Sequence, residues 1–331
     1  MEKLKVLLAT PLEEEALGKI NATSDRISVE VISGLIVSEK KGDPAAREKL
    51  DALLSQGEVL FGWPHQFPRN ILARMPRLKW VQTMSAGVDR LEAGVLQSPV
   101  TVTNVSGIHS APMAEFALHL MLSFAKQAHG CYRQKQEKQW KRFFPNVLHS
   151  KTVGILGLGS IGREIARLSK ALGMKVLATH RSAREGGRAR YVDRIFPREQ
   201  LTQLLSESDF VVLALPLTAE TTGFIGEAEL RSMKPSAVLI NISRGAIVDE
   251  NALIRALEEN WIAGAGLDVF ATEPLPPESK FWSLPNAIYS PHVSGNMPDY
   301  DLRAAEVFCE NLRRYLEGKK LLHVVDREKG Y

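Results

Sequence analysis

The stretch that decides the fold is TVGILGLGSIGREIA, residues 152–166. An apolar run precedes three glycines spaced as G-x-G-x-x-G, and a helical pattern opens directly after them. In such a loop Gly157 permits a tight turn, Gly159 lets the backbone approach a pyrophosphate, and Gly162 allows close packing of helix on strand. The free N–H groups at the helix N-terminus complement phosphate charge. The segment therefore predicts the strand, turn and helix of a dinucleotide-binding unit.

Short apolar or β-branched runs alternate with helical patterns along the whole chain, which predicts parallel strands joined by crossover helices. In the second half these runs are apolar at consecutive positions, as expected of strands buried on both faces. We therefore predict an α/β class with two doubly wound parallel-sheet domains, Rossmann-like or flavodoxin-like, and a cleft between them. Strands are expected at 6–10, 28–32, 59–61, 80–83, 100–104, 152–156, 175–179, 210–215, 237–242, 264–269 and 288–290.

Helical patterns cover 43–54, 67–75, 112–128 and 299–316. The third is apolar nearly all round, which is typical of a helix buried in a core or in a subunit interface. The fourth is followed by a short apolar run, 321–325, which we expect to return to the N-terminal domain.

Composition excludes several classes of protein. The 331 residues carry 42 basic and 38 acidic side chains, interspersed, so no nucleic-acid partner is predicted, and the basic cluster at 126–142 is expected to be a solvated face. No window approaches 18 continuous apolar residues, which argues against a membrane partner. Cys131 and Cys309 cannot form a disulfide framework, which suits a reducing, cytoplasmic location. No metal site is predicted.

The residues after the second strand of the dinucleotide unit indicate the cofactor. His180, Arg181, Ser182 and Arg184 stand where an acidic partner of the ribose 2′-hydroxyl would be expected. A carboxylate there repels a 2′-phosphate, whereas a guanidinium accepts it in a bidentate fork. The loop therefore predicts a preference for NADP(H), with NAD(H) use left open. The alternative is that Arg181 is only a solvated loop residue.

Three later segments place polar side chains at strand ends: NISRGAIVDE at 241–250, GLDVFATEPLP at 266–276 and SPHVSG at 290–295. Because the carboxyl ends of parallel strands share one edge of a sheet, we expect Arg244, Glu273 and His292 to converge there. Taken singly, each is ambiguous, since a histidine at a strand end is more often structural and Arg244 could be a surface ion-pair partner.

Together with GLGSIG at 157–162 and SAGVD at 85–89, these segments resemble the D-isomer-specific 2-hydroxyacid dehydrogenase family over nearly the whole chain. The resemblance is to its NADP-preferring glyoxylate/hydroxypyruvate reductase branch. It implies a dinucleotide-binding domain, 104–295, inserted into a discontinuous substrate domain, 1–103 plus 296–331. It also implies a homodimer formed through the dinucleotide-binding domains, in which 112–128 matches the interface helix.

The same resemblance implies roles for the polar residues in the reduction of small 2-oxo acids to D-2-hydroxy acids. Arg244 matches the arginine that binds the substrate carboxylate and polarises the carbonyl, and His292 matches the general acid. Glu273 matches the carboxylate that pairs with this histidine and favours its protonated form. The substrate-binding residues implied are Ser85, Ala86, Gly87, Arg244 and His292.

The cofactor-binding residues implied are Gly157, Leu158, Gly159, Ser160, Ile161, Gly162, His180, Arg181, Ser182, Leu215, Pro216, Thr221, Ile242, Ser243, Arg244, Asp268, His292 and Gly295. One departure concerns the loop that begins at Ala214. Many members have a histidine before its proline, where this chain has Ala214-Leu215. Only the backbone of that loop and Thr221 are therefore carried over.

Two alternatives remain open on the sequence. The first is a dinucleotide-sensing binding protein with little turnover, like the transcriptional corepressors that resemble this family. The second is a dehydrogenase of an unusual donor such as phosphite, for which a strong NAD preference is expected. The basic loop at Arg181 counts against the second alternative.

Overall fold

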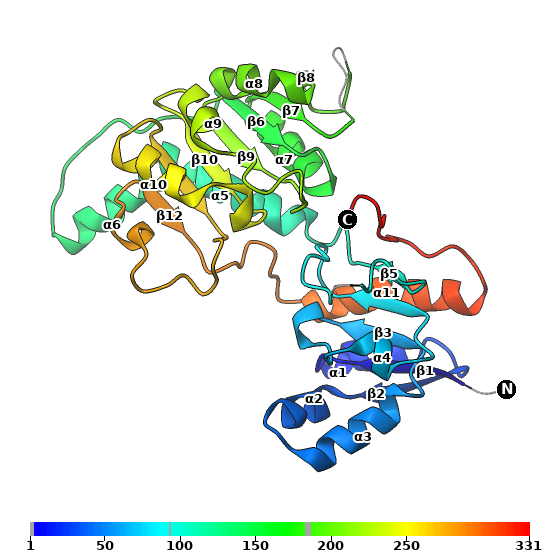
Figure 1. The fold of residues 1–331 in the computed structure, drawn as a ribbon. Coiled ribbons are helices and arrows are strands. Elements are labelled where there is room, and N and C mark those ends of the chain that lie inside the picture. Colours follow the sequence, from blue (N-terminus) through cyan, green and yellow to red (C-terminus); the bar gives the residue numbers. More distant parts are fainter. Residues whose placement is uncertain (1–2, 93, 183–186) are drawn as a thin grey trace. The chain divides into compact units, whose positions relative to one another are not determined.

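The computed structural model describes residues 3–92, 94–182 and 187–331 (Figure 1). Arg184, which the sequence places in the basic loop, lies outside these residues. The chain divides into two compact units, Met1–Ile108 with Met297–Tyr331 and His109–Asn296. Each unit is a parallel sheet with helices on both faces, which confirms the predicted doubly wound α/β class.

The first unit is built on a five-stranded parallel sheet of order β2-β1-β3-β4-β5. Successive residues of β1 alternate between two cores, because side chains on a strand point to opposite faces. The strands are β1 (Leu4–Leu8), β2 (Ile27–Val31), β3 (Val59–Gly62), β4 (Trp80–Thr83) and β5 (Thr101–Thr103). One core holds α1 (Glu14–Asn21) and α11 (Tyr300–Leu316), and the other holds α2 (Ser33–Lys40), α3 (Pro44–Leu54) and α4 (Ile71–Arg74).

The C-terminal segment belongs to this first unit, as predicted. The Val325 N–H donates to the carbonyl oxygen of Val102 at 2.9 Å, and the Asn104 N–H donates to that of His323 at 3.1 Å. The tail therefore lies along β5, next to the helix α11 that precedes it.

The second unit is built on a seven-stranded parallel sheet of order β12-β11-β10-β9-β6-β7-β8. The chain runs from β6 towards one edge and then returns to continue from β9 towards the other edge. The strand order therefore reverses between β6 and β9, and ligands of open α/β sheets bind at such a switch point. The strands are β6 (Thr152–Leu156), β7 (Lys175–Thr179), β8 (Arg194–Phe196), β9 (Phe210–Leu213), β10 (Val238–Asn241), β11 (Gly264–Leu267) and β12 (Ala287–Tyr289).

Helices cover both faces of this sheet (Figure 1). One core joins α5 and α7 to the sheet, and the other joins α8, α9 and α10 to it. The helices are α5 (Ser110–Ala125), α6 (Ala128–Gln136), α7 (Ser160–Ala171), α8 (Leu201–Glu207), α9 (Glu227–Ser232) and α10 (Glu250–Glu258), with 3-10 turns η2 (Arg198–Gln200), η3 (Gly245–Ile247) and η4 (Lys280–Ser283).

Two predicted helices differ from the structure, and one strand was not predicted. The helix expected over 112–128 ends at Ala125, because Gln127 takes a left-handed backbone with φ of 52° before α6 begins. Of the helix expected over 67–75, only α4 forms, since Phe67 is extended before a proline. The strand β8 was not predicted, because its three residues are too few to show a pattern.

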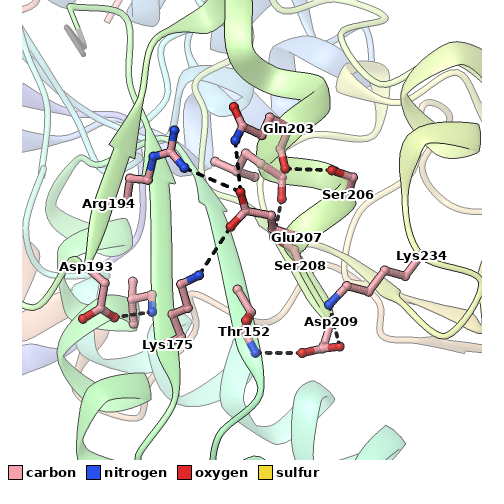
Figure 2. A network of polar contacts seen from close by, with 12 residues as sticks. Thr152, Lys175, Asp193, Arg194, Gln203, Ser206, Glu207, Ser208, Asp209 and Lys234 are labelled. Carbon is pink, nitrogen blue, oxygen red and sulfur yellow. Dashed lines mark hydrogen bonds and ion pairs between the residues drawn. The ribbon is translucent and has the colours of Figure 1, made fainter. Parts of the chain in front are cut away.

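Ion pairs and hydrogen bonds of charged side chains link the amino ends of the strands in the second unit (Figure 2). The Glu207 carboxylate lies 3.3 Å from Nζ of Lys175 and 3.6 Å from Nη1 of Arg194, which open β7 and β8. The Asp209 carboxylate accepts a hydrogen bond of 2.8 Å from the N–H of Thr152, which opens β6. This edge is thus occupied by the protein's own ion pairs, and the loops of the opposite, carboxyl edge carry the predicted site.

Both cysteines lie in helices and are free, Cys131 exposed on α6 and Cys309 buried in α11. Over the described ranges, we find no helix with the length and apolar character needed to cross a membrane. The cytoplasmic location expected from the cysteines stays a prediction.

Candidate functional site

The glycine turn after β6 leaves no room for side chains at two of its positions. Gly157 has a φ of 102°, and a Cβ there would lie 2.4 Å from the carbonyl oxygen of Ala214. A Cβ on Gly162 would lie 2.0 Å from the carbonyl oxygen of Gly157. The turn is therefore pressed against the loop that leaves β9, and α7 is pressed against the turn, as the motif predicts.

Gly159 differs from these two glycines. It is the N-cap of α7, and a Cβ on it would meet nothing within 4 Å. The protein's own packing therefore does not require glycine here, whereas a ligand that approaches the backbone closely would. Open space over the free N–H groups of a helix N-terminus fits the pyrophosphate of a dinucleotide.

The other predicted residues of this turn differ in how far their side chains are buried. Leu158 is buried and Ile161 half-buried in the core under α7, while Ser160 is exposed at the first turn of the helix. Two of the three side chains therefore serve packing.

His180, Arg181 and Ser182 follow the carboxyl end of β7. The Arg181 guanidinium is about half exposed, and its Nη2 lies 3.2 Å from Oε1 of Glu220. The Ser182 hydroxyl lies 3.3 Å from Nδ1 of His180. The predicted guanidinium thus lies at the carboxyl edge of the sheet, just after the second strand of the dinucleotide-binding motif.

The loop after β9 is held by two side chains that the resemblance singled out. The Ser243 hydroxyl donates to the Leu213 carbonyl at 2.7 Å and accepts from the Leu215 N–H at 3.1 Å, which joins the ends of β9 and β10. The Thr221 hydroxyl donates to the Pro216 carbonyl at 2.7 Å. The loop that begins at Ala214 is therefore fixed in shape at the switch point.

Arg244 follows β10 and comes directly after Ile242 and Ser243, which are both buried. Its Nη1 donates to the Ser243 carbonyl at 2.8 Å, and Nδ2 of Asn241 donates to the Arg244 carbonyl at 2.9 Å. A Cβ on the next residue, Gly245, would lie 1.9 Å from the carbonyl carbon of Phe270. The loops after β10 and β11 are thus in direct backbone contact, which brings Arg244 to the loop that carries Glu273.

Glu273 and His292 form the hydrogen-bonded pair that the sequence predicts. Oε2 of Glu273 lies 2.8 Å from Nδ1 of His292, and Oε1 accepts a 3.1 Å hydrogen bond from the Phe270 N–H. The side chains are 23% and 37% exposed, so water only partly screens the pair. With Nδ1 on the carboxylate, Nε2 is the nitrogen left for a substrate.

Asp268 holds the loop that presents His292. This carboxylate is fully buried and accepts hydrogen bonds from the Ser290 hydroxyl at 2.6 Å and from the N–H groups of Val293 and Ser294, each at 2.9 Å. The His292 N–H donates to the Asp268 carbonyl at 2.8 Å, and His292 has a left-handed φ of 54°. Asp268 thus stabilises an unfavourable backbone conformation at His292. Its contact with a cofactor stays a prediction.

His109 is a neighbour of Arg244 that sequence analysis missed. It is buried just before α5, and a Cβ on Gly295 would lie 3.1 Å from its Cδ2. Burial and the positive charge of Arg244 lower the pKa of His109 to about 4. The imidazole is therefore neutral near pH 7 and places no second positive charge beside Arg244. Only its position before a helix marked it in the sequence.

The three predicted side chains come from three adjacent strands. Arg244 follows β10, Glu273 follows β11 and His292 follows β12, and these strands are neighbours in the sheet. The structure thus brings the three to one edge of the second unit, with the glycine turn after β6 on the same edge.

The loop Ser85–Gly87 follows β4 in the first unit and is held through its carbonyl oxygens. The Thr83 hydroxyl donates to the Ser85 carbonyl at 2.8 Å, the Ser85 hydroxyl to the Gly87 carbonyl at 2.6 Å, and Nδ2 of Asn104 to the Ala86 carbonyl at 2.8 Å. Within the described residues, the three N–H groups of the loop donate to no protein acceptor. Such oriented N–H groups suit an anion.

Comparison with known proteins identifies the family. The profile of the D-isomer specific 2-hydroxyacid dehydrogenase NAD-binding domain matches residues 118–294. This range contains the glycine turn, Arg244, Glu273 and His292.

Relatives match beyond this range. A glyoxylate reductase of Korarchaeum cryptofilum is 37% identical, with 76% of this chain and 77% of the relative covered. A D-isomer specific 2-hydroxyacid dehydrogenase of Xanthobacter autotrophicus, solved with NADPH, has a TM-score of 0.84 at 30% identity, with 100% of both chains covered. An NADPH-dependent glyoxylate/hydroxypyruvate reductase of Sinorhizobium meliloti, solved with NADP and sulfate, has a TM-score of 0.82 at 29% identity, with 99% of this chain and 100% of that chain covered. The chain therefore belongs to the D-isomer specific 2-hydroxyacid dehydrogenase family and is an NAD(P)-dependent dehydrogenase.

Proposed function

We propose that this protein reduces small 2-oxo acids, with glyoxylate and hydroxypyruvate first, to D-2-hydroxy acids with NADPH. The observation that carries the proposal is the hydrogen-bonded pair Glu273–His292 on the same sheet edge as Arg244 and the glycine turn. The names of the relatives, glyoxylate reductase and NADPH-dependent glyoxylate/hydroxypyruvate reductase, support it. Steady-state assays of glyoxylate, hydroxypyruvate, pyruvate and phenylpyruvate with NADPH and NADH test it. Absence of turnover with every pair would favour the dinucleotide-sensing alternative.

In this proposal His292 is the general acid. Bound NADPH supplies the hydride, and reduction of the carbonyl carbon also requires one proton on the carbonyl oxygen. His292 Nε2–H donates that proton, while the Glu273 carboxylate at Nδ1 holds the imidazole ring in its orientation. For the reverse oxidation, the neutral imidazole accepts the proton from the substrate hydroxyl.

Arg244 is assigned to the substrate in the same proposal. Its guanidinium binds the carboxylate of the 2-oxo acid and places positive charge where the carbonyl oxygen gains negative charge. The N–H groups of the Ser85–Gly87 loop are assigned to the substrate carboxylate. His109 is neutral near pH 7, so the positive charge next to it comes from Arg244 alone among these two residues.

The Glu273–His292 pair predicts a loss of activity when its hydrogen bond is weakened. In the Glu273→Gln variant, the charge-assisted hydrogen bond of 2.8 Å at Nδ1 becomes a neutral one, so His292 is held less firmly in the position for proton transfer. The difference between a charged and a neutral hydrogen bond is roughly 1.4 kcal/mol, so we expect kcat/KM to fall about tenfold in reduction and in oxidation. Initial rates in both directions measure the loss. Unchanged rates would mean that Glu273 only organises the loop at Phe270.

The cofactor preference predicts a selective loss at Arg181. Removing a guanidinium that binds a phosphate costs roughly 1.5–3 kcal/mol, so the KM for NADPH in Arg181→Ala should rise about tenfold or more. The KM for NADH should stay nearly constant, because NADH has a 2′-hydroxyl instead. Arg188→Ala, an exposed arginine further along the same connection, is the matched control. A wild-type preference for NADH would contradict the proposal.

A homodimer is the proposed assembly. Trp140 and Phe144, in the segment after α6, have 94% and 99% of their surface exposed. Large aromatic side chains exposed together mark an interaction surface in a folded protein. Since the chain mass is 36.7 kDa, sedimentation equilibrium should give about twice this value, and a mass equal to one chain would contradict the assembly.

A further inference from the structure

We propose that Glu220 is a counter-ion in the 2′-phosphate site and that it lowers the affinity of this site for NADPH. In the protein without cofactor it neutralises Arg181, and when NADPH binds it gives up Arg181 and remains paired with Arg198. This inference rests on the proposed use of NADPH and adds a specificity-determining carboxylate to it.

The three side chains come from loops at the carboxyl edge of one sheet. Arg181 follows β7, Arg198 opens η2 after β8, and Glu220 lies in the loop after β9. Oε1 of Glu220 is 3.2 Å from Nη2 of Arg181, and its Oε2 is 4.0 Å from Nη1 of Arg198. One carboxylate therefore lies between two guanidinium groups, the first of which is the predicted ligand of the 2′-phosphate.

The backbone under Glu220 is fixed. The Thr218 N–H donates to the Thr221 hydroxyl at 2.8 Å, and the Thr222 N–H donates to the Thr218 carbonyl at 3.0 Å. Nη2 of Arg198 donates to the Glu220 carbonyl at 3.4 Å. A change of partner by Glu220 therefore needs rotation of its side chain only.

Arg198 is placed to keep the carboxylate. Its guanidinium lies 5.2 Å from the centre of the Phe224 ring, which restrains it in addition to the bond to the Glu220 backbone. Arg198, Phe224 and Glu220 all line a surface hollow of about 410 Å³. The hollow gives the carboxylate room to turn from Arg181 towards Arg198.

The higher negative charge of the 2′-phosphate lets it displace the Glu220 carboxylate from Arg181. A phosphate monoester carries about −1.5 to −2 charges at pH 7 and three acceptor oxygens, so it competes for Arg181 better than a single carboxylate does. NADH has no such group, and Glu220 then keeps Arg181. Since displacement and residual repulsion both oppose the phosphate, Glu220 weakens NADPH binding and leaves NADH binding unaffected.

The test is the affinity of the purified protein for each reduced cofactor, followed by nicotinamide fluorescence. Exposed ion pairs contribute roughly 0.4–1 kcal/mol at the upper part of their usual range, so the Kd of Glu220→Gln for NADPH should fall about two- to fivefold at low salt, with the Kd for NADH unchanged. The gain should shrink at high ionic strength. Glu199→Gln removes the same charge from the same hollow, next to Arg198, and should leave both constants unchanged.

Arg198→Ala, made alone and together with Glu220→Gln, tests the second half of the exchange. If Arg198 acts by holding Glu220, the single variant binds NADPH more weakly than the wild type, while the double variant binds it like Glu220→Gln. Equal weakening in both backgrounds would mean that Arg198 binds the phosphate itself, which would overturn this part of the inference.

Arg181→Ala separates failure of the inference from failure of the proposed function. Unchanged NADPH binding in Arg181→Ala would reject the NADPH site, and the inference with it. Weaker NADPH binding in Arg181→Ala, combined with unchanged binding in Glu220→Gln, would reject the role of Glu220 alone.

Discussion

Replacement of His292 by glutamine is expected to lower kcat/KM for glyoxylate reduction with NADPH by about 10²–10⁴-fold, the usual contribution of a general acid. Glutamine preserves a polar side chain of similar reach but cannot deliver a proton to the carbonyl oxygen. Its amide can still contact Glu273, so the loop held by Asp268 should keep its shape. Initial rates over a range of glyoxylate concentrations measure the loss.

The matched control for His292→Gln is His149→Gln, the same substitution at an exposed histidine that precedes β6. This variant should keep the wild-type kcat/KM. A loss of less than tenfold in His292→Gln, with the control unchanged, would assign the proton to another donor. Circular dichroism spectra that match the wild type establish that both variants are folded.

Replacement of Arg244 by alanine is expected to lower kcat/KM by about 10²–10³-fold, the typical cost of losing one donor to a developing oxyanion. The guanidinium is assigned to both the substrate carboxylate and the carbonyl, so KM should rise while kcat falls. Arg244→Lys should recover only part of the loss, because an ammonium keeps the charge but not the two-pronged donor geometry. Rates with glyoxylate in all three proteins measure the effect.

Arg255→Ala is the control for charge alone, since Arg255 is an exposed arginine of α10 that pairs with Glu227 at 2.8 Å. Its kcat/KM should equal that of the wild type. Wild-type rates in Arg244→Ala would leave Arg244 as a structural residue whose guanidinium serves the Ser243 carbonyl.

Much of the fold could be predicted from local patterns. The apolar runs at β6 and β7 coincide with the strands residue for residue, because consecutive apolar residues are required wherever a strand is covered on both faces. The helix ends were harder to place. The end of α5 depends on a left-handed residue, Gln127, and an amide side chain in that position carries no clear signal.

The site could be predicted only in part. Arg244, Glu273 and His292 were identified because their segments follow neighbouring parallel strands, which share one carboxyl edge, and because these segments resemble those of a known family. The residues that hold them were not identified. Ser290 acts through a contact with a residue distant in the chain and His109 through its burial beside Arg244, and no spacing in the sequence reports either. The contact of Asn241 with the Arg244 carbonyl is local, but it depends on a turn that forms only at the end of β10.

The sequence by itself determined the α/β class and the glycine turn, because these follow from the spacing of residues near one another in the chain, and it placed the candidate site residues in the loops that follow the strands. The tertiary structure alone decided three further features. It pressed Gly245 against the Phe270 backbone and so joined the loops after β10 and β11, it made Asp268 the anchor of the His292 loop, and it placed Glu220 against Arg181. Each of these depends on which strands become neighbours in the sheet, and that order is set by packing of the whole unit.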